Sequence, residues 1–71
     1  MTTAQFVEIM VLIAAREIKD RYTSIQIALK ISNVVSLLLV KMHNRKEIPT
    51  TTYDYCLDIL SLAVGERYNY E

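Results

Sequence analysis

The sequence predicts an all-α fold, a small bundle of three or four helices that forms one domain over residues 1–71. Apolar residues recur three and four positions apart along three segments, which is the spacing of amphipathic helices. No segment alternates apolar and polar residues as a half-buried strand does. Helix-breaking residues are rare, with one glycine and one proline in 71 residues. We therefore expect long helices joined by short turns.

The first helix is predicted over about 3–21. Thr2 is a favourable N-cap, and Gln5, three residues later, completes a capping box. Apolar residues lie on almost every side of this helix; one row holds Val7, Val11, Ala14 and Ile18. A helix of this kind is buried on almost every side. A chain of this length supplies too few other elements to cover it, so a partner subunit is expected.

The second helix is predicted over about 24–45, with Thr23 as N-cap and Gln26 at the third helical position. Its expected core row alternates spacings of three and four, as in a coiled coil: Ala28, Ile31, Val35, Leu38 and Met42. The sequence leaves open whether the helix is continuous or is broken at Ser32-Asn33.

The third helix is predicted over about 51–68, because Pro49 cannot continue a helix and threonines follow it. The expected core row of this helix is Tyr53, Leu57, Leu60, Val64 and Tyr68. Gly65 fits either within the helix or at its C-terminal end.

Association between copies is predicted from the apolar content. Hydrophobic residues make up 52% of the chain, and its one cysteine allows no internal disulfide. Short chains bury a small share of their surface and usually need such support. The run Leu37–Val40 directs apolar side chains to all sides, more than one core can cover. The residues expected at the subunit interface are Phe6, Ile9, Met10, Leu12, Ile13, Leu37, Leu39 and Val40.

Residues that carry chemistry are scarce, so we predict a protein that is not an enzyme and has no catalytic, cofactor-binding or metal-binding residues. His43 and Cys56 are the only residues of their types, which is too few for a structural zinc site. One glycine cannot build a phosphate-binding loop. Asp54 and Asp58 are one helical turn apart, as expected for a solvated face near a helix N-terminus.

Two groups of residues are candidates for binding a partner. Tyr55, Arg67 and Tyr70 lie in the C-terminal third, and tyrosine and arginine are enriched in interface hot spots. Arg45 and Lys46 form a separate basic site. Seven basic residues stand against two acidic ones over 16–46, although the net charge is zero. A nucleic-acid binder usually has a basic excess overall.

The segment Tyr22–Ile48 resembles helix-turn-helix and winged-helix repressors. Thr23–Ile31 would be the first helix, Ser32-Asn33 the turn and Val34–Asn44 the recognition helix, followed by a basic end. The resemblance implies DNA binding, with Arg45 and Lys46 contacting phosphates. The turn lacks the glycine usual in the family, and apolar side chains would occupy outward positions of the recognition helix.

No signal peptide or membrane-spanning stretch is evident, and a lone cysteine suits a reducing cytoplasm. The predicted function is therefore that of a small cytoplasmic interaction protein (an adaptor, inhibitor or regulator) that self-associates and docks on another macromolecule. A DNA-binding regulator and an oligomeric protein that binds a nucleotide or other small ligand are the two alternatives.

Overall fold

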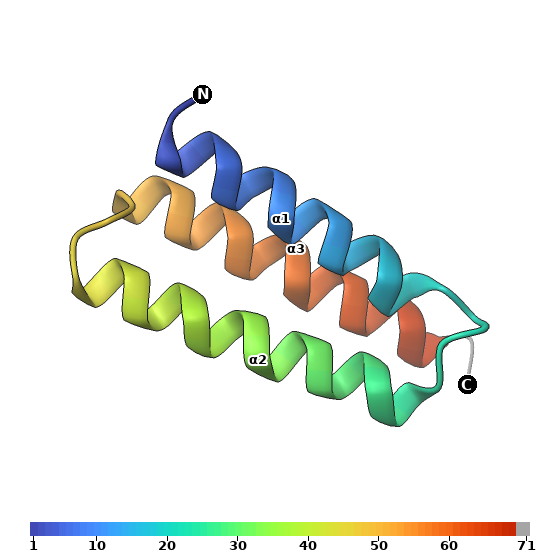
Figure 1. The fold of residues 1–71 in the computed structure, drawn as a ribbon. Helices are drawn as coiled ribbons and strands as arrows, with labels where there is room; N and C mark the ends of the chain where they lie inside the picture. Colours follow the sequence, from blue (N-terminus) through green and yellow to red (C-terminus); the bar gives the residue numbers. More distant parts are fainter. Residues whose placement is uncertain (70–71) are drawn as a thin grey trace.

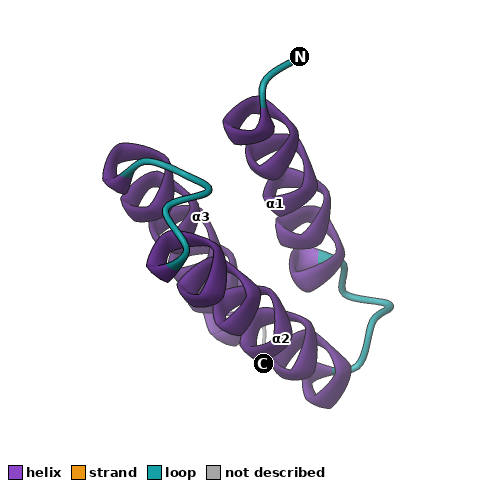
Figure 2. Ribbon diagram, turned by 60° about the vertical axis from the view of Figure 1, so that its left-hand side comes forward, coloured by secondary structure: helices purple, strands orange, loops and turns teal. Residues whose placement is uncertain are grey.

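The computed structural model describes residues 1–69, which form three helices and no strand (Figure 1; Figure 2). The helices are α1 (Thr3–Lys19), α2 (Ile25–Asn44) and α3 (Thr50–Asn69). Each helix runs antiparallel to the one before it, so α1 and α3 are parallel (Figure 1). Each helix contacts both of the others. The predicted all-α bundle is confirmed, with three helices.

The start of α1 follows the predicted capping box. The Thr2 hydroxyl accepts a hydrogen bond from the Gln5 backbone N–H at 3.1 Å. The Gln5 side-chain oxygen accepts one from the Thr2 N–H at 2.9 Å. Two N–H groups that lack a partner within the helix are thereby satisfied.

The turn between α1 and α2 differs from the prediction by one residue. Ser24, not Thr23, is the N-cap of α2, and its hydroxyl accepts from the Ile27 N–H at 3.2 Å. The Thr23 hydroxyl instead donates to the Glu17 carboxylate at 2.9 Å. Both residues are good caps, and the length of the turn decides between them.

The second helix runs without a break through Ser32 and Asn33. It ends in a Schellman motif, in which Lys46 has a left-handed backbone with a φ of 60°. The Lys46 N–H donates to the His43 carbonyl, and the Glu47 N–H donates to the Met42 carbonyl. This ending turns the chain back toward Pro49 and the start of α3.

The core contains Val7, Val11, Ile18, Ala28 and Leu60 from the predicted rows, but other positions of those rows differ. Leu39 is 2% exposed and Leu38 is 53% exposed, the reverse of the prediction. Ala15 is buried where Ala14 was expected, and Tyr68 lies half exposed on the surface. The buried apolar residues are Val7, Val11, Ala15, Ile18, Ala28, Leu39, Ile48, Cys56, Leu60 and Ala63.

The buried row of α3 is therefore rotated relative to the predicted one. It consists of Thr52, Cys56, Leu60, Ala63 and Arg67. Gly65 lies inside the helix, so the alternative that it ends the helix is wrong. Tyr53, expected in the core row, is half-buried and stacks on His43 with the ring centroids 4.2 Å apart.

A candidate interaction surface between α1 and α2

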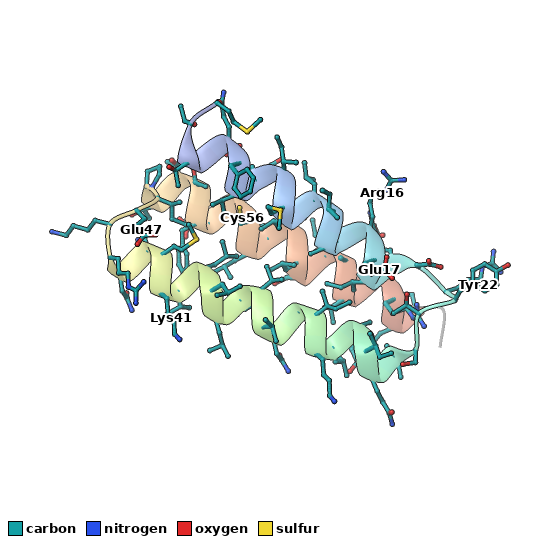
Figure 3. All side chains as sticks on the ribbon, viewed as in Figure 1. Arg16, Glu17, Tyr22, Lys41, Glu47 and Cys56 are labelled. Atoms are coloured by element: carbon teal, nitrogen blue, oxygen red, sulfur yellow. The ribbon has the colours of Figure 1, made fainter. Side chains whose placement is uncertain are left out.

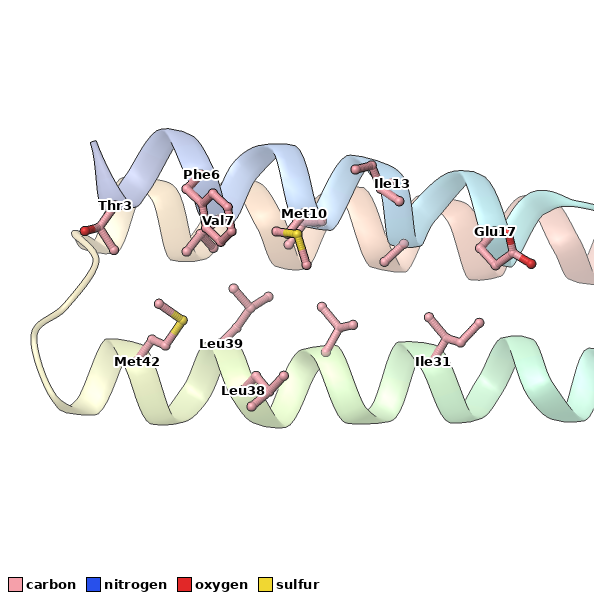
Figure 4. A pocket seen from close by; sticks show the side chains of 13 residues that line it. Thr3, Phe6, Val7, Met10, Ile13, Glu17, Ile31, Leu38, Leu39 and Met42 are labelled. Atoms are coloured by element: carbon pink, nitrogen blue, oxygen red, sulfur yellow. The ribbon is translucent and has the colours of Figure 1, made fainter. Parts of the chain in front are cut away.

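An open apolar groove of about 500 Å³ runs between α1 and α2. Figure 4 shows how its walls are arranged along the two antiparallel helices. Phe6 and Met42 lie at the end next to the N-terminus of α1, and Glu17 lies across from Ile31 at the other end (Figure 4). Val11 and Leu39 are buried at its base.

Large apolar side chains on both walls remain exposed. On α1, Phe6, Met10 and Ile13 are 55%, 52% and 59% exposed. The α2 wall includes the exposed Leu38, and a second apolar hollow lined by Ile27 and Val34 adjoins the groove through Ile31 and Val35. We call the following set the α1/α2 face: Phe6, Met10, Ile13, Ile27, Val34 and Leu38, each more than half exposed.

Charged groups lie at the margins of this face. Among residues 1–69, Thr3 and Glu17 are the only polar residues that line the groove, and they lie at its opposite ends. Lys30 borders the adjoining hollow on α2. The Glu17 carboxylate also holds the Thr23 hydroxyl, so its position is fixed by the turn. The middle of the groove has no group that could orient a polar ligand.

The structure divides the residues predicted for a subunit interface. Phe6, Met10 and Ile13 lie together in the groove, whereas Ile9 and Leu12 lie on the side of α1 toward α3. Leu37 and Val40 are exposed but do not line the groove. Leu39 is buried in the core of a single chain, so its assignment to an interface is wrong. It is inward because its side of α2 faces both other helices.

Three residues of the α1/α2 face were missed at the level of sequence. The sequence predicted Leu38 in the core and placed Ile27 and Val34 on no surface. All three are exposed. With Ile31 they follow spacings of four, three and four, the pattern of a coiled-coil seam. The predicted core row, which ends in Met42, shares Ile31 and Leu38 with this seam and has the same alternation of spacings.

Tyr55 lies in a separate shallow hollow on the side of α1 and α3 opposite the groove. It is 49% exposed and lines the hollow with Met1, Ile9 and Leu12. Gln5 and Glu8 supply polar atoms there. Tyr55 is thus placed as a surface residue, as its assignment to partner binding requires. Tyr70 lies outside the described residues.

Arg67 is a structural residue of the interior, which corrects its assignment to a partner-binding surface. Its side chain is 3% exposed. The guanidinium donates hydrogen bonds to the backbone carbonyls of Asp20 and Thr23 in the turn between α1 and α2. The five N–H donors of arginine suit this bridging of two carbonyls. The charged group of Arg67 therefore binds the protein's own backbone.

Arg45 and Lys46 lie at the end of α2, in the turn toward α3, and both are exposed. A hollow lined by Lys46, His43 and Pro49 adjoins them. The helix-turn-helix arrangement does not form in this part of the chain. That motif needs a turn at Ser32-Asn33, where α2 is one continuous helix.

The residues with reactive side chains are used for packing. His43 stacks on Tyr53, and its Nε2 is 3.1 Å from the Thr50 hydroxyl. Cys56 is fully buried in the middle of the bundle (Figure 3). Burial raises the pKa of the Cys56 thiol, and the Glu8 carboxylate adds to this shift. A thiol of this kind is a poor nucleophile. Among residues 1–69, no three His, Cys, Asp or Glu side chains are grouped to hold a metal ion.

The apolar character of α2 has a second consequence. Over an 18-residue window of α2 the mean hydropathy reaches 1.6, so by length and composition alone this helix could cross a membrane. Lys30 and Lys41 interrupt its apolar runs, so no long uncharged stretch in the sequence indicates such a helix. Only 11% of this apolar stretch is buried in the bundle. The rest of the stretch is half-buried or exposed, and it includes the α2 part of the α1/α2 face.

Comparisons with protein families, curated proteins and solved structures give no match to this chain. A function for this chain has therefore to be inferred from its own surface.

Proposed function

We propose that this protein is a non-catalytic interaction module, an adaptor or regulator, that acts by burying its α1/α2 face against another protein molecule. The observation that carries this proposal is a set of six large apolar side chains on one side of the bundle. Each of them is more than half exposed, whereas the core of the bundle is well buried. Contiguous apolar surface of this kind marks interaction sites.

The size of the face suits a protein contact. Half-exposed side chains at six positions amount to about three fully buried ones, which is about 5–9 kcal/mol of burial free energy at ~1.5–3 kcal/mol each. Association costs about 4–15 kcal/mol in lost freedom of motion. The face alone barely offsets this cost, but a partner that buries an equal apolar area brings the total well past it.

The shape of the groove favours a helix as the bound element. It runs along two helices, is apolar throughout its middle and has polar residues only at its ends. Helix-in-groove recognition uses this arrangement, with apolar residues three and four apart inserted along the groove. A nucleotide or another polar metabolite would need convergent polar groups that the lining residues do not supply.

The hollow around Tyr55 gives the module a second surface on the opposite side. A tyrosine there combines an apolar ring with a hydroxyl that stays hydrated. The module could thus hold one molecule on the α1/α2 face and another on this side, which is the arrangement an adaptor needs.

The proposal is tested by placing a photo-crosslinking amino acid at Ile13 in the cells that make the protein. Leu62 on α3 is the matched control, because it is 67% exposed and does not line the groove. We expect discrete protein adducts from position 13 and few from position 62. Equal labelling at both positions, or adducts with lipid or nucleic acid alone, would contradict the proposal.

A further inference from the structure

We propose that the molecule that covers the α1/α2 face is a second copy of this chain, related by a two-fold axis parallel to the bundle. In this dimer α1 of each copy lies over α2 of the other. The inference rests on the proposed function, because it names the partner of the same face. Three observations support it: the accessible area, the spacing of the apolar residues and the charges at the rim.

The accessible area of one chain exceeds what a folded monomer of its mass exposes. It is 5148 Å² for 8.2 kDa. The size scaling for monomeric proteins gives about 4,500 Å² at this mass, which leaves an excess of roughly 600 Å². A standard interface buries about 800 Å² on each partner. The excess therefore approaches what one side of a stable dimer requires.

The two helices of the face carry matching apolar patterns. Phe6, Met10 and Ile13 are spaced by four and three on α1. Ile27, Val34 and Leu38 lie on α2 in the same alternation, with Ile31 between them. Helices with this spacing pack through interdigitating side chains in four-helix bundles. Two copies joined by this face supply two α1 and two α2 helices, enough for such a bundle, with α3 of each copy on its outer sides.

The charged residues at the edge of the α1/α2 face favour one orientation of the two copies over the other. Glu17 lies at the groove end nearest the α1–α2 turn, across from Ile31 (Figure 4). Lys30 precedes Ile31 and borders the same region. An axis parallel to the helices keeps this end of one copy beside the same end of the other. Glu17 then approaches Lys30 of the partner subunit, and two such pairs form in each dimer.

The other two-fold arrangement is disfavoured by the same charges. It would lay α2 on the partner's α2 in antiparallel order. Lys30 would then lie level with the partner's Lys41, which is near the opposite end of the helix. Two lysine pairs would face each other in a region with an apolar middle, and like charges across an interface are repulsive. In the proposed arrangement, moreover, every neighbouring pair among the four central helices is antiparallel, which also suits their dipoles.

The first measurement is the native mass by sedimentation equilibrium over a range of concentrations. We expect twice the mass of the 8.2 kDa chain at about 100 µM, a concentration that detects even weak dimers. Ile13→Asp and Leu38→Asp should each give a monomer with an unchanged helical circular dichroism spectrum. Leu62→Asp, the matched control, should remain a dimer. A monomeric wild type, or a dimer lost only in Leu62→Asp, would overturn the inference.

Charge exchange tests the arrangement. Glu17→Lys and Lys30→Glu should each raise the dimer Kd roughly 25-fold, about fivefold for each of the two symmetric contacts. The double variant should restore the dimer. Thr23→Ala removes the hydrogen bond to Glu17 without changing charge, so it controls for the turn. Tighter association of Lys30→Glu alone would indicate relief of a lysine pair and would overturn the proposed arrangement.

Separate outcomes identify failure of this inference and failure of the proposed function. A monomer that cross-links through position 13 to a different protein overturns the second copy as partner and leaves the interaction module standing. A monomer without protein adducts that co-sediments with vesicles of phosphatidylcholine and phosphatidylglycerol overturns both. In that case the apolar face would contact lipid.

Discussion

Arg67 offers the sharpest test of what holds the bundle together. Its guanidinium lies in the interior at the end of α3 and donates to the carbonyls of Asp20 and Thr23. Both carbonyls belong to the turn between α1 and α2. One side chain thus ties the end of the third helix to the junction of the first two.

The cost of removing this side chain follows from the number of contacts. Hydrogen bonds from a charged donor contribute about 1.5–3 kcal/mol each, so two contribute about 3–6 kcal/mol. Asp20 is exposed and Thr23 is half-buried, so water can replace part of the lost donation. We therefore expect Arg67→Met, which keeps the apolar stem, to lower the free energy of unfolding by about 2–4 kcal/mol. A domain of 71 residues is stable by about 4–10 kcal/mol, so the loss is large.

The assay is urea unfolding followed by helical circular dichroism at one fixed protein concentration, since a dimer unfolds in a concentration-dependent way. Arg67→Lys should fall between the wild type and Arg67→Met, because a lysine supplies a single donor centre in place of the arginine fork. Arg21→Met, in the same turn but exposed, is the control and should change little. A loss below about 1 kcal/mol in Arg67→Met, or one equal to that of Arg21→Met, would refute this account.

Three further predictions concern the ends and the middle of the helices. Thr2→Ala removes the cap that bonds the Gln5 N–H and should lower the free energy of unfolding by ~1 kcal/mol, with no such loss in Thr3→Ala as the neighbouring control. Gly65→Ala should raise the free energy of unfolding by about 0.5–1 kcal/mol, because Gly65 has a helical backbone and an added Cβ meets no atom within 4 Å. A measured loss of stability would contradict this reasoning. Burial, and then the Glu8 carboxylate, raise the pKa of Cys56 in the folded state, so the folded protein keeps this proton after an unfolded chain has lost it. Stability should therefore be unaffected below the ordinary thiol pKa of 9.0 and fall as the pH rises past it, and unfolding curves of Cys56→Ala should lack this fall.

Some residues of the candidate interaction surfaces could be predicted from the sequence, and others could not. The apolar excess on α1 pointed to exposed apolar residues there, and Phe6, Met10 and Ile13 are indeed exposed together in the groove. The tyrosine and arginine near the C-terminus looked alike as interface residues, but Tyr55 is on the surface and Arg67 is inside. A buried arginine is unusual, and hydrogen bonds to carbonyls of a distant turn help to make it favourable. No local pattern indicates those carbonyls.

The sequence alone determined the three helices and the capping of α1, because these depend on residues within about four positions of one another. The Thr2–Gln5 capping box and the break at Pro49 are signals of this kind. The tertiary structure decided which side of each helix is inward. Leu37–Val40 is apolar on every side, so periodicity fits several rotations of α2 equally well. Contact with α1 and α3 on one side made Leu39 the core residue and left Leu38 on the open face.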